Sequence, residues 1–328
     1  MIITRAPLRI SFFGGGTDYP EFFRAEGGAV LATAIDKFTY VTASRFFSDL
    51  FDFCVRVSYS KAESARRVED LEHKVFREAL KLCGFTKDIE LHTVADLPAF
   101  TGLGSSSSFT VALLQALRSF RGIFRAPLEL AYEAIDVERN RVGDNVGCQD
   151  QVTAAVGGFN LIEFRREDDI RVHPVPLARE RSEDFARHLV LIYTGITRRA
   201  SDLAARQLER LPANVETLRR MRAMAERGWD LLTGGQPLSR FGELLDEAWT
   251  AKRGLDTAIS SAEIDRLYAM GREAGALGGK LLGAGGGGFL AFFAPPESHE
   301  RLRRTLAPHP MLDFTIGAHG SEVIFSTG

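Results

Sequence analysis

Three glycine-rich segments, far apart along the chain, constrain the fold more than any other feature of this sequence. They occupy residues 14–16, 102–108 and 283–288, and each adjoins strongly apolar sequence. Glycine adopts backbone conformations that other residues avoid, and it lets a backbone approach a ligand closely. A linker, a hinge and a phosphate-binding loop are each compatible with one such segment taken alone. The rest of the chain must therefore decide between them.

The middle segment, residues 102–108, has the composition of an anion-binding loop. Gly102, Leu103 and Gly104 are followed by four consecutive serines and then by a densely apolar stretch with helical spacing. Serine is a favoured helix N-cap, and a helix N-terminus presents unpaired N–H groups and the positive end of the helix dipole. We therefore predict that this glycine-serine segment binds phosphate at the start of a helix. The alternative is an ordinary helix cap after a turn.

The last glycine segment, residues 283–288, contains the spacing GxGxxG but lacks its usual context. The dinucleotide-binding fingerprint follows a strand and opens a helix. Here a helix-like stretch precedes the glycines and an apolar strand follows them. We expect a loop packed tightly against another part of the molecule, with a flexible hinge as the alternative. The P-loop pattern GxxxxGK[ST] is absent from the sequence.

Composition narrows the class of protein. The chain has 328 residues, 45% of them hydrophobic, and a formal net charge of −2, which is typical of a soluble globular protein with two cores and argues against a large basic surface for nucleic acid. Three isolated cysteines, Cys54, Cys83 and Cys148, form no CxxC pair, so we expect a reducing, cytoplasmic location. Arg5 and Arg9 interrupt the N-terminal apolar run, and no apolar stretch is long enough for a membrane span. We therefore expect neither a signal peptide nor a membrane protein.

Hydrophobic periodicity predicts an α+β protein in two parts. The first 60 residues are β-rich, and a hairpin is expected near residues 157–177. Apolar spacing predicts helices over 62–82 and 109–120, and from Pro127 to about Arg141. From Phe185 onward, one strand is followed by long helical stretches between about 201 and 275, and short strands close the chain at 288–294, 311–316 and 321–326. We place a domain boundary near 175–185, which gives domains of residues 1–180 and 181–328.

In this order and spacing, the three glycine segments resemble the three motifs of the GHMP kinase superfamily, which includes galacto-, homoserine, mevalonate and phosphomevalonate kinases. The first motif resembles APLRISFFGGGTDY, the second (PxxxGLGSS) is matched at residues 98–106, and the third (KxxGAGGGG) at residues 280–288. The resemblance covers nearly the whole chain. It implies a two-domain fold, with an N-terminal domain like domain 2 of ribosomal protein S5 and a C-terminal ferredoxin-like α/β sandwich. It also implies phosphoryl transfer from ATP to an alcohol group of a small molecule.

The resemblance also implies which residues hold the nucleotide and its metal. ATP phosphates would be bound by Gly102, Leu103, Gly104, Ser105, Ser106, Ser107, Gly285 and Gly286. Mg²⁺ would be held by Ser106 and Glu138, in keeping with its preference for hard oxygens and few protein ligands. For Glu138 the alternative is a solvated helix charge paired with Arg139 or Arg141.

Two further residues match the catalytic pair of the family. Asp150 matches the aspartate that faces the acceptor hydroxyl as general base, and Arg9 matches the cation beside it. A neighbouring cation favours the ionised form of a carboxylate. Phosphoryl transfer mainly requires in-line positioning and neutralised charge. Some members of the family work without such a base, so whether Asp150 takes the proton stays open.

The first motif bears on the substrate. Galactokinase-like members carry GEHTD where this chain has GGGTD, so Gly15 and Gly16 stand in place of two larger side chains. The GGGTD form resembles the branch that contains heptose 7-phosphate kinases, with fucose-type kinases nearby, whose members phosphorylate the anomeric hydroxyl. We predict that Gly15, Gly16, Thr17 and Asp18 bind the sugar, and that Arg198 reaches a 7-phosphate. The alternative for Arg198 is a surface arginine at a helix start.

The predicted reaction is therefore the conversion of D-glycero-D-manno-heptose 7-phosphate to the 1,7-bisphosphate, with a fucose-type or other hexose 1-kinase as the alternative. Three other classes of protein compete with this prediction. A sensor that binds sugar and ATP without turnover need not keep the whole residue set. A dinucleotide-dependent oxidoreductase conflicts with the context of the glycines, and a serine hydrolase lacks a GxSxG elbow. Sugar and ATP are the expected partners, and a homodimer is left open.

Overall fold

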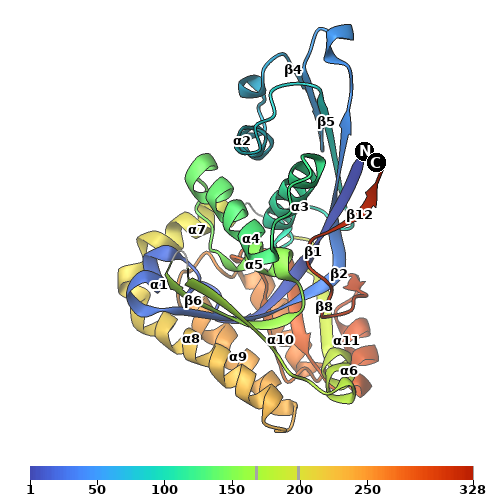
Figure 1. Ribbon diagram of the computed structural model, residues 1–328. Coiled ribbons are helices and arrows are strands. Elements are labelled where there is room, and N and C mark those ends of the chain that lie inside the picture. The colour runs from blue at the N-terminus through green and yellow to red at the C-terminus, as the bar shows by residue number, and fades with distance from the viewer. Residues whose placement is uncertain (167–168, 198–199, 328) are drawn as a thin grey trace.

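The computed structural model describes residues 1–166, 169–197 and 200–327, and the larger of its two sheets extends from the top of the molecule in Figure 1 to below its middle. In this part of the chain the sheet contains eight strands: β1 (Ile2–Phe13), β2 (Gly28–Arg45), β3 (Val55–Ser58), β4 (Ala62–Ala65), β5 (Ile89–Ala95), β6 (Phe159–Arg166), β7 (Asp169–Pro174) and β12 (Glu322–Ser326). The order is β12-β1-β2-β5-β3-β4, and β6 pairs with the first half of β2 and with β7. The hairpin expected near 157–177 is thus confirmed. Between β1 and β2 the chain turns through the first glycine segment and α1 (Pro20–Glu26).

Helices cover one face of this sheet. They are α2 (Lys74–Leu82), α3 (Ser105–Phe120), α4 (Pro127–Ile135) and α5 (Gln149–Val156). α3 is apolar on most of its surface because it packs against both β1 and β2. α4 does not stop where its regular hydrogen bonding ends. It continues as a π-helical turn, Asp136–Val142, so the helix predicted from Pro127 to about Arg141 is present with a changed geometry.

The helix predicted over residues 62–82 is shorter than expected. Residues 62–65 form β4, a 3₁₀ turn (η2, Val68–Asp70) follows, and α2 begins only at Lys74. The buried carboxylate of Glu63 accepts hydrogen bonds from the backbone N–H groups of Glu72, at 2.6 Å, and His73, at 3.2 Å. These bonds satisfy N–H groups just before the helix and fix where it starts. Apolar spacing alone could not reveal this contact.

The second sheet has the order β11-β8-β10-β9 and lies in the lower half of the molecule. It consists of β8 (Leu189–Tyr193), β9 (Gly278–Leu281), β10 (Phe289–Phe293) and β11 (Met311–Leu312). Around it are α6 (Arg179–Arg187), α7 (Ala200–Glu209), α8 (Leu211–Thr233), α9 (Ser239–Arg253), α10 (Ala262–Glu273) and α11 (His299–Thr305). Two more short 3₁₀ turns occur, η1 (Ser48–Leu50) and η4 (Pro296–Ser298).

The stretch before the last glycine segment is a strand, not the helix-like element expected from its sequence. β9 pairs antiparallel with β10, so the last glycine segment connects two neighbouring strands. Gly278 lies so close to α9 that a Cβ there would sit 1.8 Å from the carbonyl oxygen of Gly242. Only glycine fits at this position. The contact with α9 could not be predicted from the local sequence, which suggested a helix.

The two halves share an apolar core rich in phenylalanine. Phe12 at the end of β1 packs edge-to-face on Phe185 of α6 and Phe241 of α9, with ring centroids 5.6 and 5.4 Å apart. Phe293 of β10 joins the same group, 5.5 Å from Phe185. Edge-to-face aromatic pairs add about 0.5–1.5 kcal/mol each to the burial of their area. The end of β1 is therefore anchored in both halves of the molecule. The first glycine segment, which follows β1, is held where the two halves meet.

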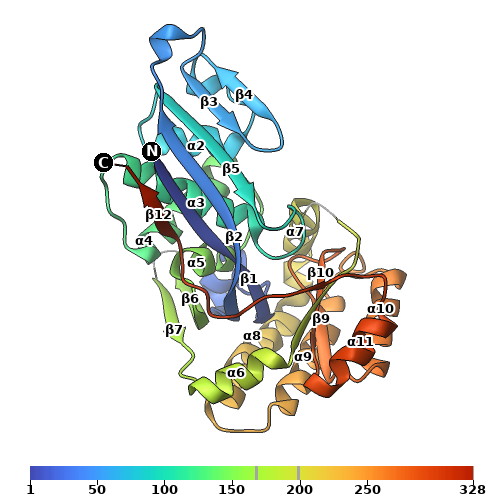
Figure 2. The ribbon, with the colours of Figure 1, turned by 90° about the vertical axis from the view of Figure 1, so that its right-hand side faces the viewer.

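The last strand of the chain does not belong to the half of the molecule to which the predicted domain division assigned it. The boundary predicted near residue 180 falls between β7 and α6, but β12, which that division assigned to the C-terminal domain, returns to the first sheet. There it pairs antiparallel with β1, beside the N-terminus (Figure 2). Such edge pairing depends on the folded sheet rather than on any local signal.

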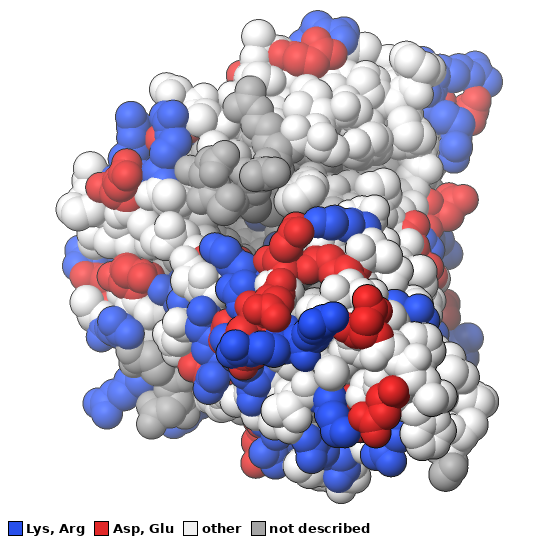
Figure 3. All heavy atoms as spheres, turned by 90° about the horizontal axis from the view of Figure 1, so that it is seen from above, with Lys and Arg blue, Asp and Glu red and all other residues white. Residues whose placement is uncertain are grey.

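The surface agrees with the balanced composition. On the face seen in Figure 3, basic and acidic side chains are interspersed rather than separated into areas of one sign. Among the residues that the structure describes, none of the helices combines the length and apolarity needed to cross a bilayer.

Candidate active site

A cavity of about 290 Å³ opens where the three glycine segments meet at the junction of the two halves. Most of the residues predicted from sequence to form a site line it. These are Arg9, Gly15, Gly16, Asp18, Gly102, Gly104, Ser105, Ser106, Ser107 and Asp150. Segments that lie far apart along the chain are thus brought to one pocket.

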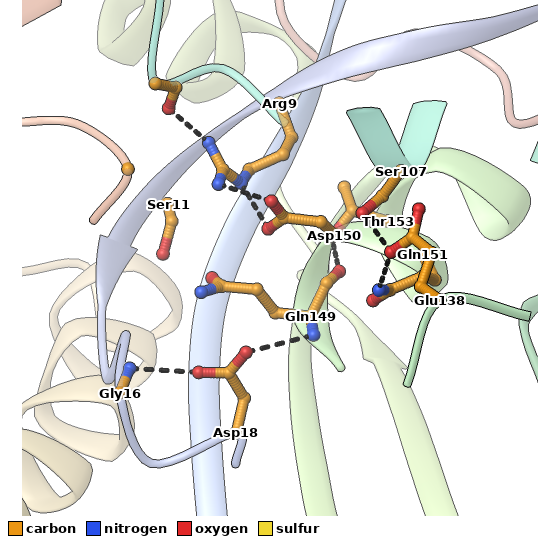
Figure 4. Close-up of polar contacts among 12 residues, drawn as sticks. Arg9, Ser11, Gly16, Asp18, Ser107, Glu138, Gln149, Asp150, Gln151 and Thr153 are labelled. Atoms are coloured by element: carbon orange, nitrogen blue, oxygen red, sulfur yellow. Dashed lines mark hydrogen bonds and ion pairs between the residues drawn. The ribbon is translucent and has the colours of Figure 1, made fainter. Parts of the chain in front are cut away.

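The wall of the pocket is built around the pair predicted to be catalytic, Arg9 on β1 and Asp150 in the first turn of α5. Nε and Nη2 of Arg9 donate to the two carboxylate oxygens of Asp150, each at 2.8 Å (Figure 4). Nη1 donates to the carbonyl oxygen of Gly102 at 2.6 Å, and the backbone N–H of Arg9 bonds to Leu103 O at 3.0 Å. The side chain of Arg9 is 5% exposed and that of Asp150 is 24% exposed. This bidentate geometry fixes the carboxylate at the pocket wall and ties it to the glycine-serine segment.

The glycine-serine segment has the conformation that its composition predicts. Gly102 and Gly104 have φ angles of +80° and +77°, and α3 begins at Ser105 immediately afterwards. The N-terminus of a sixteen-residue helix therefore faces the pocket and provides unpaired N–H groups for an anion. The side chain of Leu103 is fully buried in the core between the two halves, so only its backbone is available for the predicted phosphate contact.

The last glycine segment supports the glycine-serine segment from the other half. A Cβ on Gly102 would lie 2.6 Å from the carbonyl oxygen of Leu282, so the two backbones are in direct contact. The predicted phosphate contacts of Gly285 and Gly286 are not supported. A Cβ on Gly285 would strike the backbone of Ile259, and the N–H of Gly286 is already donated to Ile259 O at 2.9 Å. The pocket is lined instead by the neighbouring residues 283 and 284.

Glu138 is a buried carboxylate at the back of the glycine-serine segment, carried by the π-helical turn. It is 1% exposed and accepts hydrogen bonds from Ser107 Oγ at 2.9 Å, from Thr110 Oγ1 at 2.6 Å and from Nε2 of Gln151. Burial raises the pKa of Glu138 to about 7, although these hydrogen bonds act in the opposite direction. Glu138 is therefore not a solvated helix charge paired with Arg139 or Arg141, and that alternative is wrong.

The serine that meets Glu138 differs from the predicted one. Ser107 makes the contact, whereas Ser106 is exposed at the mouth of the pocket. The reason is geometric, because Ser107 and Thr110 lie on the same face of α3, three residues apart. A carboxylate with two hydroxyls beside it is a donor set of hard oxygens, which fits Mg²⁺. Within the described ranges, no cluster of three or more His, Cys, Asp or Glu side chains is placed to hold a metal ion by itself.

Asp18 is completely buried behind the first glycine segment. Its carboxylate accepts the backbone N–H groups of Gly16, at 2.9 Å, and Gln149, at 3.1 Å. Burial, followed by the charge of Asp150, raises the pKa of Asp18 above its ordinary value. Thr17 does not face the pocket as predicted, because its hydroxyl donates to the carbonyl oxygens of Gly14, at 2.8 Å, and Ala29, at 3.1 Å. The predicted contact of Arg198 lies outside the described residues.

Two polar side chains that sequence reasoning missed point into the pocket near Asp18. Ser11 Oγ and Gln149 Oε1 are buried, and neither has a hydrogen-bond partner among the described residues. Figure 4 shows both directed toward the space between Arg9 and Asp18. A Cβ on Gly15 would lie 3.6 Å from each of these two side chains, so Gly15 keeps this space open. Buried groups of this kind are normally satisfied, which points to a polar ligand.

Two buried lysines line the same pocket. Lys280 on β9 is the first residue of the third motif but had no predicted role, and sequence reasoning missed Lys252 on α9 altogether. Lys280 donates to the carbonyl oxygens of Ser11 and Phe12, both at 2.9 Å, and is 3% exposed. Lys252 is 6% exposed. Its place could have been read from the sequence, because it continues the apolar spacing of Ala248 and Trp249 along the buried face of a helix.

Comparison with known proteins gives this arrangement a family. Residues 65–158 match the N-terminal domain of GHMP kinases, and residues 232–309 match the C-terminal domain. The chain is 30% identical over 320 residues to D-glycero-alpha-D-manno-heptose 7-phosphate kinase of Campylobacter jejuni, which covers 93% of both proteins. The chain belongs to the GHMP kinase family. Other relatives include the L-fucokinase/L-fucose-1-P guanylyltransferase of Bacteroides fragilis, at 26% identity over 97% of this chain and 38% of that protein.

The fold of this GHMP kinase is shared with solved structures. The crystal structure of a D-glycero-D-manno-heptose 1-phosphate kinase from Bacteroides thetaiotaomicron matches it with a TM-score of 0.81 over 100% of both chains, at 23% identity. The predicted α+β class and two-domain GHMP kinase fold are confirmed. The protein is a phosphotransferase that acts on an alcohol group, in a family that uses ATP as phosphoryl donor. The oxidoreductase and hydrolase alternatives are thereby set aside.

Proposed function

We propose that this kinase phosphorylates the anomeric hydroxyl of D-glycero-D-manno-heptose 7-phosphate, with ATP as donor, and releases the 1,7-bisphosphate. The observation that carries the proposal is the open, polar space beside Asp150. The free Ser11 hydroxyl and the Gln149 amide face that space, and Gly15 leaves it without a side chain. A ligand rich in hydroxyl groups would satisfy both side chains. The 30% identity to a heptose 7-phosphate kinase supports the choice of sugar.

The chain's own residues have separate tasks in the proposed reaction. The N-terminus of α3 would bind the phosphates of ATP, and the carboxylate of Asp150, aimed by Arg9, would orient the acceptor hydroxyl and take its proton. Arg9 would keep neighbouring negative charges balanced as the phosphoryl group moves. Glu138 and Ser107 would hold Mg²⁺, and that ion would neutralise phosphate charge when bound.

The proposal is tested by a substrate panel. The purified protein is given ATP and Mg²⁺ with heptose 7-phosphate, fucose, galactose or mannose, and ADP release is measured for each. We expect kcat/KM for heptose 7-phosphate to exceed the others by at least about a hundredfold, because a site built for given polar groups rejects analogues that lack them. Phosphorus NMR of the product should show a second phosphate on the anomeric carbon.

Each other outcome of the panel has a definite meaning. Preference for an unphosphorylated hexose would refute the heptose assignment and leave the kinase intact, and preference for fucose would favour the second relative. ATP and sugar binding without ADP release would identify a sensor.

A further inference from the structure

Lys252 is a charged residue on the buried, otherwise apolar face of α9. The neighbouring inward-facing positions are apolar, and Trp249 one turn earlier is fully buried. Lys252 nevertheless places its ammonium group inside the protein, where it donates to the carbonyl oxygens of Leu281, at 3.1 Å, and Gly283. An ammonium group has three N–H donors, so these two bonds leave one donor free. The side chain lines the pocket.

The ammonium group of Lys252 has no counter-ion among the residues that the structure describes. Within the described part of the chain, no carboxylate lies within ion-pair distance of Lys252. Burial and the positive charge of Arg9 lower the pKa of Lys252 to about 7. Lys280 adds a third cation at the same pocket, and its pKa is also lowered by burial, by Lys252 and by Arg9. A buried charge without a counter-ion costs free energy. These cations are therefore expected to bind an anion in the pocket.

The position of Lys252 indicates which kind of anion it would meet. One of the two carbonyls that accept its hydrogen bonds belongs to Gly283, and a Cβ on Gly283 would lie 2.6 Å from Cα of Gly102. Lys252 therefore approaches the glycine-serine segment from the C-terminal half, whereas α3 provides N–H groups from the N-terminal half. An anion between them would be a phosphate group in contact with both halves.

We infer that Lys252 is a phosphate-binding residue, which contributes an ammonium group from α9 to the phosphoryl group in the pocket. Two phosphates could occupy that position, the terminal phosphate of ATP and the phosphate carried by the acceptor sugar. The first source requires only kinase activity, and the second rests on the proposed heptose function. In either case the bound phosphate would act as the counter-ion for the ammonium group of Lys252.

The test compares Lys252→Met with wild type and with Arg253→Met. Arg253 is the next residue on α9, but it forms an exposed ion pair with Asp265 at 3.0 Å, so its replacement removes the same charge outside the pocket. Dissociation constants are measured by calorimetry for ADP, for a non-hydrolysable ATP analogue, for heptose 7-phosphate and for the unphosphorylated heptose. Loss of one charge-assisted hydrogen bond to phosphate corresponds to about a ten- to hundredfold weaker affinity.

The two sources predict different patterns. If Lys252 contacts the terminal phosphate of ATP, Lys252→Met loses affinity for the ATP analogue but not for ADP, and kcat/KM falls with every acceptor. If it contacts the sugar phosphate, the loss is confined to heptose 7-phosphate. An equal loss for ADP and the ATP analogue, or values within twofold of Arg253→Met for all four ligands, would overturn the inference. Should wild type fail to use heptose 7-phosphate, the proposed function fails, while the ADP and ATP arms still test Lys252.

Discussion

Replacing Asp150 by Asn separates its chemical role from its role as the partner of Arg9. The amide keeps one oxygen acceptor but turns an NH₂ group toward one of the two N–H donors that now bond at 2.8 Å. Breaking a fully buried ion pair costs about 3–5 kcal/mol. Asp150 is 24% exposed and Arg9 keeps its bond to Gly102, so we expect a smaller loss of unfolding free energy. An estimate of about 2 kcal/mol corresponds to one charge-assisted hydrogen bond.

The catalytic effect of Asp150→Asn should be much larger than the loss of stability. A positioned general base contributes about a hundred- to ten-thousandfold to the rate. We therefore expect kcat to fall by at least a hundredfold while the dissociation constant for ATP stays within threefold of wild type. Steady-state ADP release and calorimetric ATP titration measure these quantities, and thermal unfolding should show a decrease of only a few degrees.

A matched control is Asp169→Asn, which removes the carboxylate of an exposed pair with Arg171 at 3.0 Å. Such exposed pairs contribute about 0–1 kcal/mol, so both stability and kcat should stay close to wild type. If Asp150→Asn is destabilised as expected but keeps kcat within threefold, Asp150 only positions Arg9, and the reasoning about proton transfer is refuted.

Three further predictions concern other residues of the pocket. Because the folded pKa of Lys252 is lowered to about 7, the unfolded chain binds the extra proton above that pH, and Lys252 makes wild-type stability rise with pH by up to about 1.4 kcal/mol per unit. Lys252→Met should lose this contribution, keep that of Lys280, and be the more stable protein at pH 7 in urea titrations, whereas a slope equal to that of wild type would contradict the prediction. Gly102→Ala should weaken ATP binding at least about tenfold, because its Cβ would meet Leu282 O at 2.6 Å and force the two backbones apart. The control Gly122→Ala, at a φ of +69° with open space around it, should show only the cost of backbone strain, about 1–2 kcal/mol in thermal unfolding, and unchanged ATP affinity. Gly15→Glu should raise KM for the sugar at least about tenfold and leave ATP affinity within twofold in the same assays, and an unchanged sugar KM would show that the sugar does not lie beside Gly15.

Much of the site could be predicted because its chemistry is encoded locally. Gly102, Gly104 and the serines after them predicted a helix N-terminus that binds an anion, and the structure has α3 beginning at Ser105 with both glycines at positive φ. The Arg9–Asp150 pair was likewise expected from the motifs, and its bidentate contact is present.

The errors share one physical cause, which is that a contact across the fold decides what a local pattern leaves open. The family motif assigned Ser106 to share Mg²⁺ with Glu138, but the pitch of α3 turns Ser107, not Ser106, toward the carboxylate. Thr17 looked available for a ligand, and its hydroxyl is used to close the glycine turn.

The sequence by itself determined the family, the three glycine segments and the identity of the charged pair, because these depend on residue types at fixed local spacing. Only the tertiary structure decided that Ser11, Gln149 and Lys252 face the same pocket. A serine in a strand, a glutamine at the first position of a helix and a lysine on a helix carry no individual signal. Their meaning arises because, among the described residues, burial leaves Ser11 and Gln149 without a hydrogen-bond partner and Lys252 without a counter-ion, at the place where a ligand would supply both.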